Sequence, residues 1–193
     1  MDTYNNELLY CNGRFKPYMR GKIHFLGIFI LPLFYLQSIN FINVLTLIIF
    51  EAQFIISSLY HIINHKYKNE ILLQYLDHIS IFWSIFGGST YLLYNSGYYI
   101  PIIINLFVNI YINTIYNVWN LRLIGSYGLL NFILLFNYYK INYGIILNLI
   151  LHSSTILTIY SEYPLKKNKF FGYHEISHIC ILLAFCQLTM INI

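Results

Sequence analysis

The chain has 193 residues, of which 58% are apolar and only 9% are charged. A typical soluble domain is about 45–50% apolar and about 25% charged, so this chain has too few charges to cover a globular surface. The composition disfavours a soluble enzyme, a disordered protein and a nucleic-acid-binding protein. The three cysteines include no CxxC pair, which argues against a disulfide framework. A polytopic membrane protein remains.

The chain begins with a short polar tail, residues 1–20. No short apolar core with a small-residue cleavage site follows Met1, so we expect no cleavable signal peptide. The rest of the chain, residues 21–193, is predicted to be one membrane domain. A membrane-spanning helix needs about 20 apolar residues. Apolar segments of about this length recur and predict seven spans, at 22–38, 40–63, 74–94, 98–117, 121–138, 141–160 and 172–192.

Each span is predicted to be a helix. In hydrocarbon an unpaired backbone group costs several kcal/mol, and a helix satisfies its own backbone groups. A β-barrel would instead show alternating stretches of about 10 residues, whereas runs such as GIFILPLF do not alternate. The expected fold class is therefore all-α, a bundle of seven transmembrane helices.

The basic residues predict how this bundle is oriented. Cytoplasmic loops of membrane proteins carry an excess of Lys and Arg. With the N-terminus inside, only Lys140 of the eleven basic residues falls on the outer side. We therefore predict a cytosolic N-terminus and a C-terminus, Ile193, on the opposite side. The inner basic residues are Arg14, Lys16, Arg20, Lys22, Lys66, Lys68, Arg122, Lys166, Lys167 and Lys169.

Ionisable residues within spans mark functional sites by default. Ser57 and His61 are four residues apart near the inner end of the second span. His174 and His178 have the same spacing at the inner start of the seventh span, and residues at this spacing share one helical face. Six side chains are expected within about two turns, roughly 10 Å, of one membrane surface: His24, Ser57, His61, Asp77, His174 and His178.

This grouping predicts a zinc site. Three neutral imidazoles from two helices, with one open position, suit a catalytic zinc ion. We predict that His61, His174 and His178 hold Zn²⁺. Asp77, at the inner start of the third span, is predicted to orient or deprotonate the water that the metal activates. Ser57 is predicted to help hold that water or an oxyanion.

The remaining ionisable residues in or near spans receive structural interpretations. His152 is predicted to be a helix-packing residue, and His65 and His78 are predicted to lie at the membrane interface. Glu175 points about 100° around the helix from its neighbouring histidine, which favours a capping or interfacial residue. Glu51 lies in the second span, and the sequence predicts no role for it.

Asparagines and glycines mark two further features of the spans. The fourth span carries a stripe of four asparagines at four-residue spacing. Asparagine side chains hydrogen-bond between transmembrane helices, so this stripe is interpreted as a seam between helices, with a polar path as the alternative. Gly87 and Gly88 in the third span are predicted to permit a close helix approach. The stripe consists of Asn105, Asn109, Asn113 and Asn117.

Three blocks of sequence resemble a known family. Residues 57–91 (SSLYHIINHKYKNEILLQYLDHISIFWSIFGGSTY) contain Ser-x-x-x-His, a basic loop, Leu-Asp, and later Gly with Ser/Thr. Residues 171–179 read FGYHEISHI and residues 23–27 read IHFLG. In this order, over about residues 20–193, the blocks resemble the hemolysin III family, which belongs to the larger group of progestin and adiponectin receptors.

The resemblance implies both a fold and a site. It implies a seven-helix membrane fold. In structurally known relatives of this superfamily, including alkaline ceramidases, three histidines hold zinc near one membrane face. The matching positions here are His61, His174 and His178. Ser57 and Asp77 match the residues that contact the water or support the ligands.

These observations leave three functions open. The first is a zinc-dependent hydrolase that acts within the membrane on a lipid amide or ester, as a ceramidase does. The second is a pore-forming cytolysin, in line with the family name, and the third is a lipid-sensing receptor with structural zinc. In each case membrane lipids are the expected partners and nucleic acid is not. A change at Asp77 should abolish hydrolysis, whereas a pore should survive it.

Overall fold

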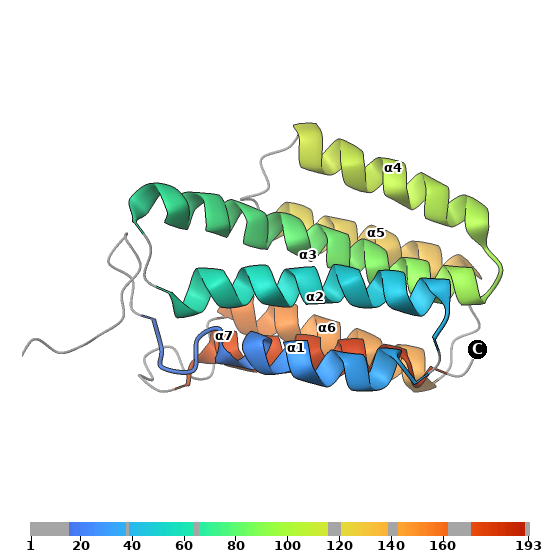
Figure 1. Cartoon of the computed structure of the whole chain (residues 1–193). Coiled ribbons are helices and arrows are strands. Elements are labelled where there is room, and N and C mark those ends of the chain that lie inside the picture. Colours follow the sequence, from blue (N-terminus) through green and yellow to red (C-terminus); the bar gives the residue numbers. More distant parts are fainter. Residues whose placement is uncertain are drawn as a thin grey trace, which may run out of the picture.

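The computed structural model of the chain describes residues 16–37, 39–63, 66–115, 121–138, 143–161 and 171–191. Within these ranges the chain forms seven helices and no strand, which confirms the all-α class. The helices lie side by side as a bundle (Figure 1). They are α1 (Lys22–Tyr35), α2 (Phe41–Ile62), α3 (Tyr67–Asn95), α4 (Tyr99–Ile115), α5 (Leu121–Tyr138), α6 (Tyr143–Ser161) and α7 (Tyr173–Leu188).

Of the described helices, only α2 is both long and apolar enough to cross a membrane by length and composition. Its 22 residues exceed the roughly 20 that a bilayer requires. Four other apolar segments are shorter, which leaves seven spans as an expectation. These segments are Lys22–Tyr35, Tyr99–Ile115, Ile124–Leu135 and Tyr143–Thr158.

The start of α3 differs most from the predicted spans. The third span was predicted to begin at residue 74, but the helix begins at Tyr67. Its first turns include the charged residues Lys68 and Glu70. A prediction based on apolar segments leaves such residues out of the span. Hydropathy predicts where a chain is apolar, whereas a helix continues wherever its backbone groups pair. Asp77 is therefore about three turns into α3, not at its start.

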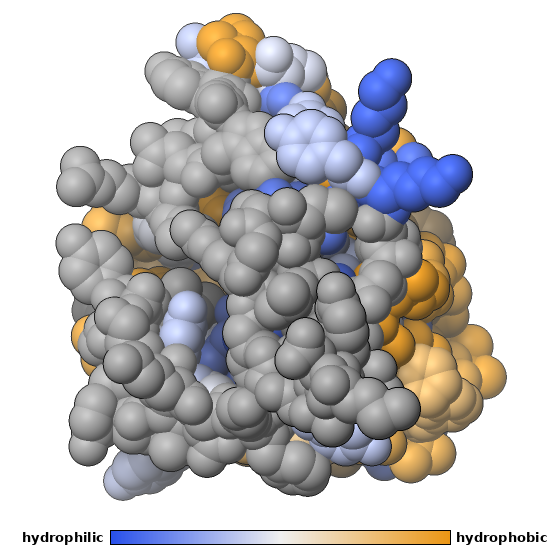
Figure 2. All heavy atoms as spheres, turned by 90° about the vertical axis from the view of Figure 1, so that its left-hand side faces the viewer, coloured by the Kyte–Doolittle hydropathy of each residue, from blue (hydrophilic) through white to orange (hydrophobic). Residues whose placement is uncertain are grey.

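All seven helices alternate in direction along the bundle. The N-terminal ends of α1, α3, α5 and α7 lie at the same end of the bundle as the C-terminal ends of α2, α4 and α6 (Figure 1). We call this end the histidine end, because His24, His61 and His174 lie within the first or last turn of their helices there. Hydrophilic side chains gather at one edge of this end, with hydrophobic side chains along the flank (Figure 2).

Two glycines bring the start of α1 close to α2. A Cβ atom on Gly27 would lie 2.5 Å from Cδ1 of Phe54, so only glycine fits there without a shift of the ring. A Cβ atom on Gly21 would lie 2.8 Å from Cβ of His61. Gly21 also has a φ of 79°, in the left-handed region that favours glycine. These contacts fix α1 beside the last turns of α2.

The two glycines of α3 that were predicted to permit a close helix approach differ in how tightly their neighbours pack. A Cβ atom on Gly87 would lie 3.1 Å from Cγ2 of Ile49 in α2, so this glycine does permit the predicted close approach. A Cβ atom on Gly88 would meet Leu188 at 3.8 Å, an ordinary contact. Only Gly87 is needed for the packing of α3 on α2.

Asparagines of α4 hydrogen-bond to the neighbouring helices α3 and α5. The amide of Asn105 donates to Ser89 Oγ at 2.8 Å and to Asn131 Oδ1 at 2.6 Å. The hydroxyl of Tyr127 donates to Asn105 Oδ1 at 2.9 Å. Asn109 donates to a backbone carbonyl of α3 and to the Tyr127 hydroxyl. Both asparagines are 0% exposed, so the seam interpretation describes them and a polar path does not.

The other two members of the stripe are different. Asn113 hydrogen-bonds back to Asn109 within α4. Asn117 lies outside the described residues. The seam is therefore built at Asn105 and Asn109, the two asparagines nearest the start of α4.

Candidate metal centre

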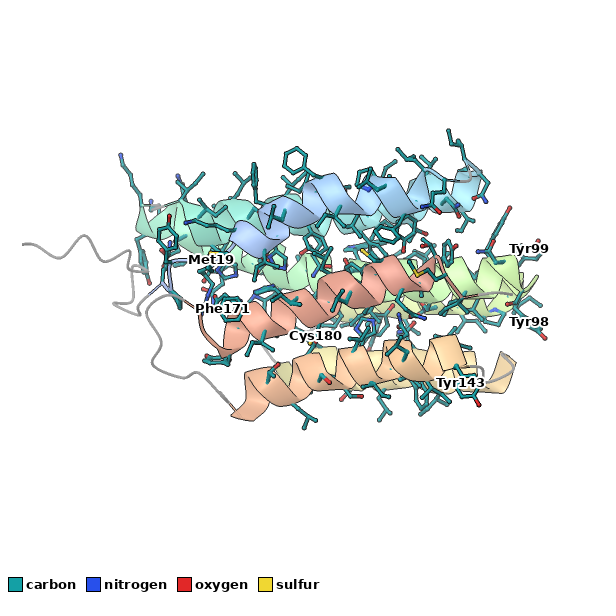
Figure 3. The ribbon with its side chains drawn as sticks, turned by 90° about the horizontal axis from the view of Figure 1, so that it is seen from below. Met19, Tyr98, Tyr99, Tyr143, Phe171 and Cys180 are labelled. Carbon is teal, nitrogen blue, oxygen red and sulfur yellow. The ribbon has the colours of Figure 1, made fainter. Side chains whose placement is uncertain are left out.

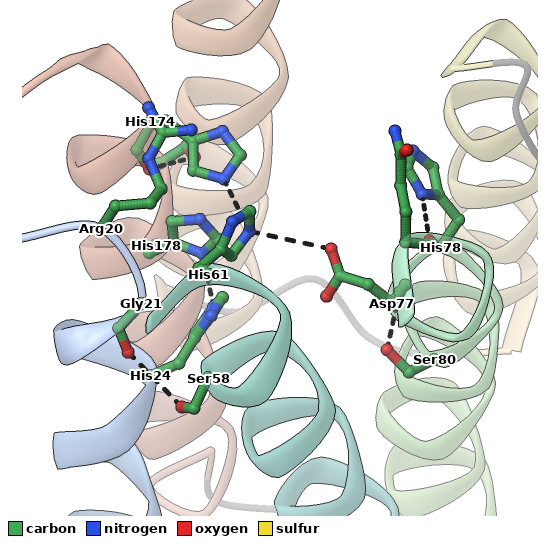
Figure 4. A network of polar contacts seen from close by, with 12 residues as sticks. Arg20, Gly21, His24, Ser58, His61, Asp77, His78, Ser80, His174 and His178 are labelled. Atoms are coloured by element: carbon green, nitrogen blue, oxygen red, sulfur yellow. Dashed lines mark hydrogen bonds and ion pairs between the residues drawn. The ribbon is translucent and has the colours of Figure 1, made fainter. Parts of the chain in front are cut away.

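Three histidines from α2 and α7 converge at the histidine end (Figure 4). One ring nitrogen from each of His61, His174 and His178 lies within 4.8 Å of the others. The Nε2 atoms of His61 and His174 are 3.3 Å apart. His61 and His178 are buried, and His174 is half-buried. The structure thus brings together the three predicted ligands in a group that could hold a metal ion.

The nitrogen atoms of His178 provide a test of this fit. Its Nε2 is buried and has no hydrogen-bond partner among the described residues. An unpaired buried polar atom costs free energy. A metal ion bound by this nitrogen would remove that cost, and imidazole nitrogen is a common metal ligand in proteins. The residues present therefore fit a metal ion.

Asp77 places a buried carboxylate beside the three imidazoles. Its Oδ2 is 3.8 Å from Nε2 of His61, and the side chain points from α3 toward α2 (Figure 4). It is not one of the three convergent ligands. Although α3 begins earlier than predicted, Asp77 still lies beside His61, because the extra turns extend α3 beyond the end of α2 (Figure 1).

Ser57 lies one turn before His61 on α2. Its side chain is 1% exposed and lies next to the carboxyl group of Asp77. Its hydroxyl interacts with that carboxyl, although the two groups do not meet the geometry of a full hydrogen bond in the described part of the chain. A hydroxyl in this position remains available to a water molecule or a substrate oxygen.

Glu175 organises the first turn of α7. Its Oε2 accepts a hydrogen bond of 2.6 Å from the backbone N–H of Gly172, which is the N-cap residue. Its Oε1 accepts a charge-assisted hydrogen bond from Nε of Arg20. The capping interpretation of Glu175 is confirmed. The neighbouring His174 is fixed on the side of the turn that faces His61 (Figure 4).

Arg20 is the participant that sequence reasoning missed. It precedes α1, in the turn that ends at Gly21, and was counted only as one of the inner basic residues. Its pairing with Glu175 joins positions 155 residues apart. The spacing of residues within one helix does not predict a contact between residues so far apart in the sequence.

His24 also joins the cluster. Its Nε2 is in hydrogen-bond contact with Nδ1 of His178. The two ring centroids are 3.7 Å apart, and the ring planes lie at 84°. All six side chains expected near one another therefore lie at the histidine end, each beside another member of the group.

Other histidines lie apart from this cluster. Nδ1 of His78 is 2.7 Å from the backbone oxygen of Gln74 in its own helix, and its ring points away from His61 (Figure 4). His152 in α6 packs with its ring centroid 6.2 Å from that of Phe185, in agreement with its interpretation as a packing residue. His65 lies outside the described residues.

Glu51 remains without a role. Its Oε1 is buried and has no hydrogen-bond partner among the described residues. It lies in α2, ten positions before His61 and thus about 15 Å along the helix from the cluster. Nothing on the described helices connects it with the metal centre.

This arrangement supplies the parts of a hydrolytic metal site. Three imidazoles leave part of a metal's coordination open, a buried carboxylate can accept a proton, and a serine hydroxyl can donate a hydrogen bond.

Comparisons with family models, with curated proteins and with solved structures found no match. The functional argument therefore rests on the chain's own geometry.

Proposed function

We propose that this chain is an integral membrane protein of the hemolysin III type, with seven membrane-spanning helices and Zn²⁺ held by His61, His174 and His178. We propose further that it hydrolyses a lipid amide or ester. The observation that carries the proposal is the convergence of three imidazoles beside the buried Asp77 carboxylate. Each part of the proposal has its own support.

The surface of the helices supports a membrane location. Large apolar side chains are exposed on several helices, for example Phe29 at 62%, Phe107 at 67% and Leu157 at 67%. Soluble monomers rarely expose contiguous apolar patches beyond a few hundred Å². A bilayer would cover these side chains and would favour seven spans, although four of the apolar segments are shorter than a typical span.

Tyrosines at the ends of the helices support the same location. Exposed Tyr98, Tyr99 and Tyr143 gather at the end of the bundle opposite Met19 and Phe171 (Figure 3). Tyrosine is enriched where a membrane meets water, since its ring is apolar and its hydroxyl is polar. We infer that this tyrosine group marks the outer membrane surface.

The metal argument favours zinc. Imidazole also binds copper, iron and nickel, but three neutral histidines with one open position are typical of catalytic zinc. Zinc in such a site activates a water molecule for attack at neutral pH. Asp77 would accept a proton from that water. The Ser57 hydroxyl would donate a hydrogen bond to the water or to the substrate's carbonyl oxygen.

A hydrolase explains the site better than a pore does. The Asn stripe was the support for a pore, and its members Asn105 and Asn109 are fully buried and hydrogen-bonded to other helices. A purely structural zinc site would need neither a carboxylate beside the ligands nor a serine hydroxyl beside that carboxylate. The pair formed by Asp77 and Ser57 favours catalysis.

Metal content and lipid products test this proposal. Purified protein in detergent should contain one zinc ion per chain, and His61→Ala, His174→Ala or His178→Ala should remove most of it. Wild-type protein incubated with a mixture of lipid amides and esters should release fatty acid. Asp77→Asn should keep much of the zinc but lose activity by at least about 100-fold, the lower end of the usual contribution of a general base.

The control is His152→Ala, since His152 lies outside the cluster. It should retain both zinc and activity. Wild-type protein without zinc would refute the metal site. Zinc-loaded protein that releases no product from any lipid, or an Asp77→Asn variant with full activity, would refute the hydrolase.

A further inference from the structure

A fourth imidazole lies against the candidate metal centre without belonging to its ligand set. His24 is the third residue of α1 and is 1% exposed. Its Nε2 contacts Nδ1 of His178, while the three converging ligands are His61, His174 and His178. In Figure 4 His24 lies on the α1 side of the cluster, away from Asp77.

Metal binding by Nε2 of His178 would require one particular placement of protons at its contact with His24. A neutral imidazole has one N–H donor and one nitrogen acceptor. For Nε2 of His178 to bind a metal ion, its lone pair must be free, so the proton of His178 is on Nδ1. That N–H then donates to Nε2 of His24, and the proton of His24 is on its Nδ1. Nε2 of His178 and Nδ1 of His24 are both buried and both lack a hydrogen-bond partner among the described residues.

Packing holds His24 in this orientation. Its ring lies edge-on to Phe54 of α2, with centroids 4.8 Å apart. The helix that carries it is fixed against α2 at Gly21 and Gly27, where no Cβ atom fits. The hydroxyl of Ser58 also donates a hydrogen bond of 3.4 Å to the carbonyl of Gly21. These contacts hold His24 rigidly beside His178.

We infer that His24 is a positioning residue of the metal centre. It accepts the Nδ1–H of His178 and so holds that imidazole in the tautomer and orientation that present Nε2 to a metal ion. The inference rests on the proposed function, because it requires a metal at the three histidines. Metal-ligating histidines usually donate their second N–H to a carboxylate, a backbone carbonyl or water. In this chain a neutral imidazole from another helix provides the acceptor.

Two variants of His24 test the inference. One keeps roughly the volume of the side chain but has no hydrogen-bond acceptor, and the other keeps an acceptor. His24→Leu fills the space but accepts no hydrogen bond, so zinc affinity should fall about 10–100-fold, the usual cost of losing such a partner. His24→Gln keeps an acceptor oxygen at the end of its side chain and should retain most of the affinity. His152→Leu, in α6, should leave the affinity unchanged. Zinc dissociation constants come from competition with a chelator, on full-length protein in detergent.

A second measurement reads the tautomer directly and does not depend on the folding of a variant. Nitrogen-15 NMR of histidine-labelled, metal-free wild-type protein should show the proton of His178 on Nδ1 and none on Nε2. A proton on Nε2 would overturn the inference.

The cobalt-substituted protein should also change its visible absorption in His24→Leu, because the ligand geometry would relax.

The outcomes separate this inference from the proposed function. If the wild type binds no zinc, the proposed function fails and the inference fails with it. If the wild type binds zinc and His24→Leu binds it equally tightly, only the positioning role of His24 fails. If His24→Leu and His24→Gln lose affinity equally, hydrogen-bond acceptance is refuted and packing alone is supported.

Discussion

Residues that are adjacent in the chain take different tasks at the candidate metal centre. His174 faces His61, while Glu175 turns to the N-cap of α7 and to Arg20. The angle of about 100° between successive residues of a helix separates the two functions. The sequence predicted this division, because it depends on helical geometry within one element. The partner Arg20 was not predictable, since its contact depends on how α1 and α7 pack.

Replacement of Glu175 should weaken both the helix start and the metal centre. Glu175→Ala removes the cap of Gly172 and leaves Arg20, a partly buried cation, without its partner. Loss of a cap costs about 0.5–2 kcal/mol, and the unpaired cation adds to this cost. We expect a lower melting temperature in detergent and weaker zinc binding. Glu70→Ala, at the start of α3, provides the matched control for zinc binding. Unchanged zinc affinity in Glu175→Ala would show that His174 is held by other contacts.

At the scale of helices, hydropathy predicted the elements and missed the contacts between them. Six of the seven predicted spans match their helices closely, because a buried or lipid-facing helix is apolar along its length. The start of α3 was missed, because polar residues also form helix. The close approach at Gly27 was missed as well, although the prediction at Gly87 was correct. A glycine shows that small size is tolerated, but the sequence alone does not show which partner helix requires it.

Gly27→Ala should destabilise the bundle. The added Cβ would lie 2.5 Å from the Phe54 ring, so the ring or α1 must shift. Overpacking of this kind costs about 1–3 kcal/mol. Gly125→Ala is the matched control, because no described residue has an atom within 4 Å of a Cβ built there. That substitution should be neutral or stabilise α5 by about 0.4–1 kcal/mol.

Thermal unfolding in detergent measures both glycine variants. A Gly27→Ala protein as stable as the wild type would mean that α1 adjusts freely against α2. The packing that holds His24 beside His178 would then be less rigid than the structure indicates.

The basic residues that the structure describes gather at one end of the bundle. The described basic residues all lie at the histidine end, either before α1 or at the N-cap or in the first turn of a helix: Lys16, Arg20, Lys22, Lys66, Lys68 and Arg122. The remaining basic residues, including Lys140, lie outside the described residues. The tyrosine group of Tyr98, Tyr99 and Tyr143 lies at the opposite end (Figure 3).

This asymmetry predicts the orientation of the protein in its membrane. Basic residues close to helix ends are retained on the cytosolic side, so the histidine end should face the cytosol and the tyrosine group should face outward. The N-terminus should then be cytosolic and Ile193 external, since the seven spans proposed above would place the two ends on opposite sides. The metal centre would meet its substrate's polar group near the cytosolic surface.

Reporter tags at the two ends of the chain check this orientation in sealed vesicles of known sidedness. A protease added outside right-side-out vesicles should remove the C-terminal tag and leave the N-terminal tag intact. Tags accessible from the same side would contradict an odd number of spans. A protected C-terminal tag with an accessible N-terminal tag would keep seven spans but reverse the bundle, and would place the histidines on the external face. Replacing Lys66 and Lys68 by Gln should weaken the expected orientation, whereas Lys140→Gln should strengthen it, because each change shifts the balance of basic residues between the two sides.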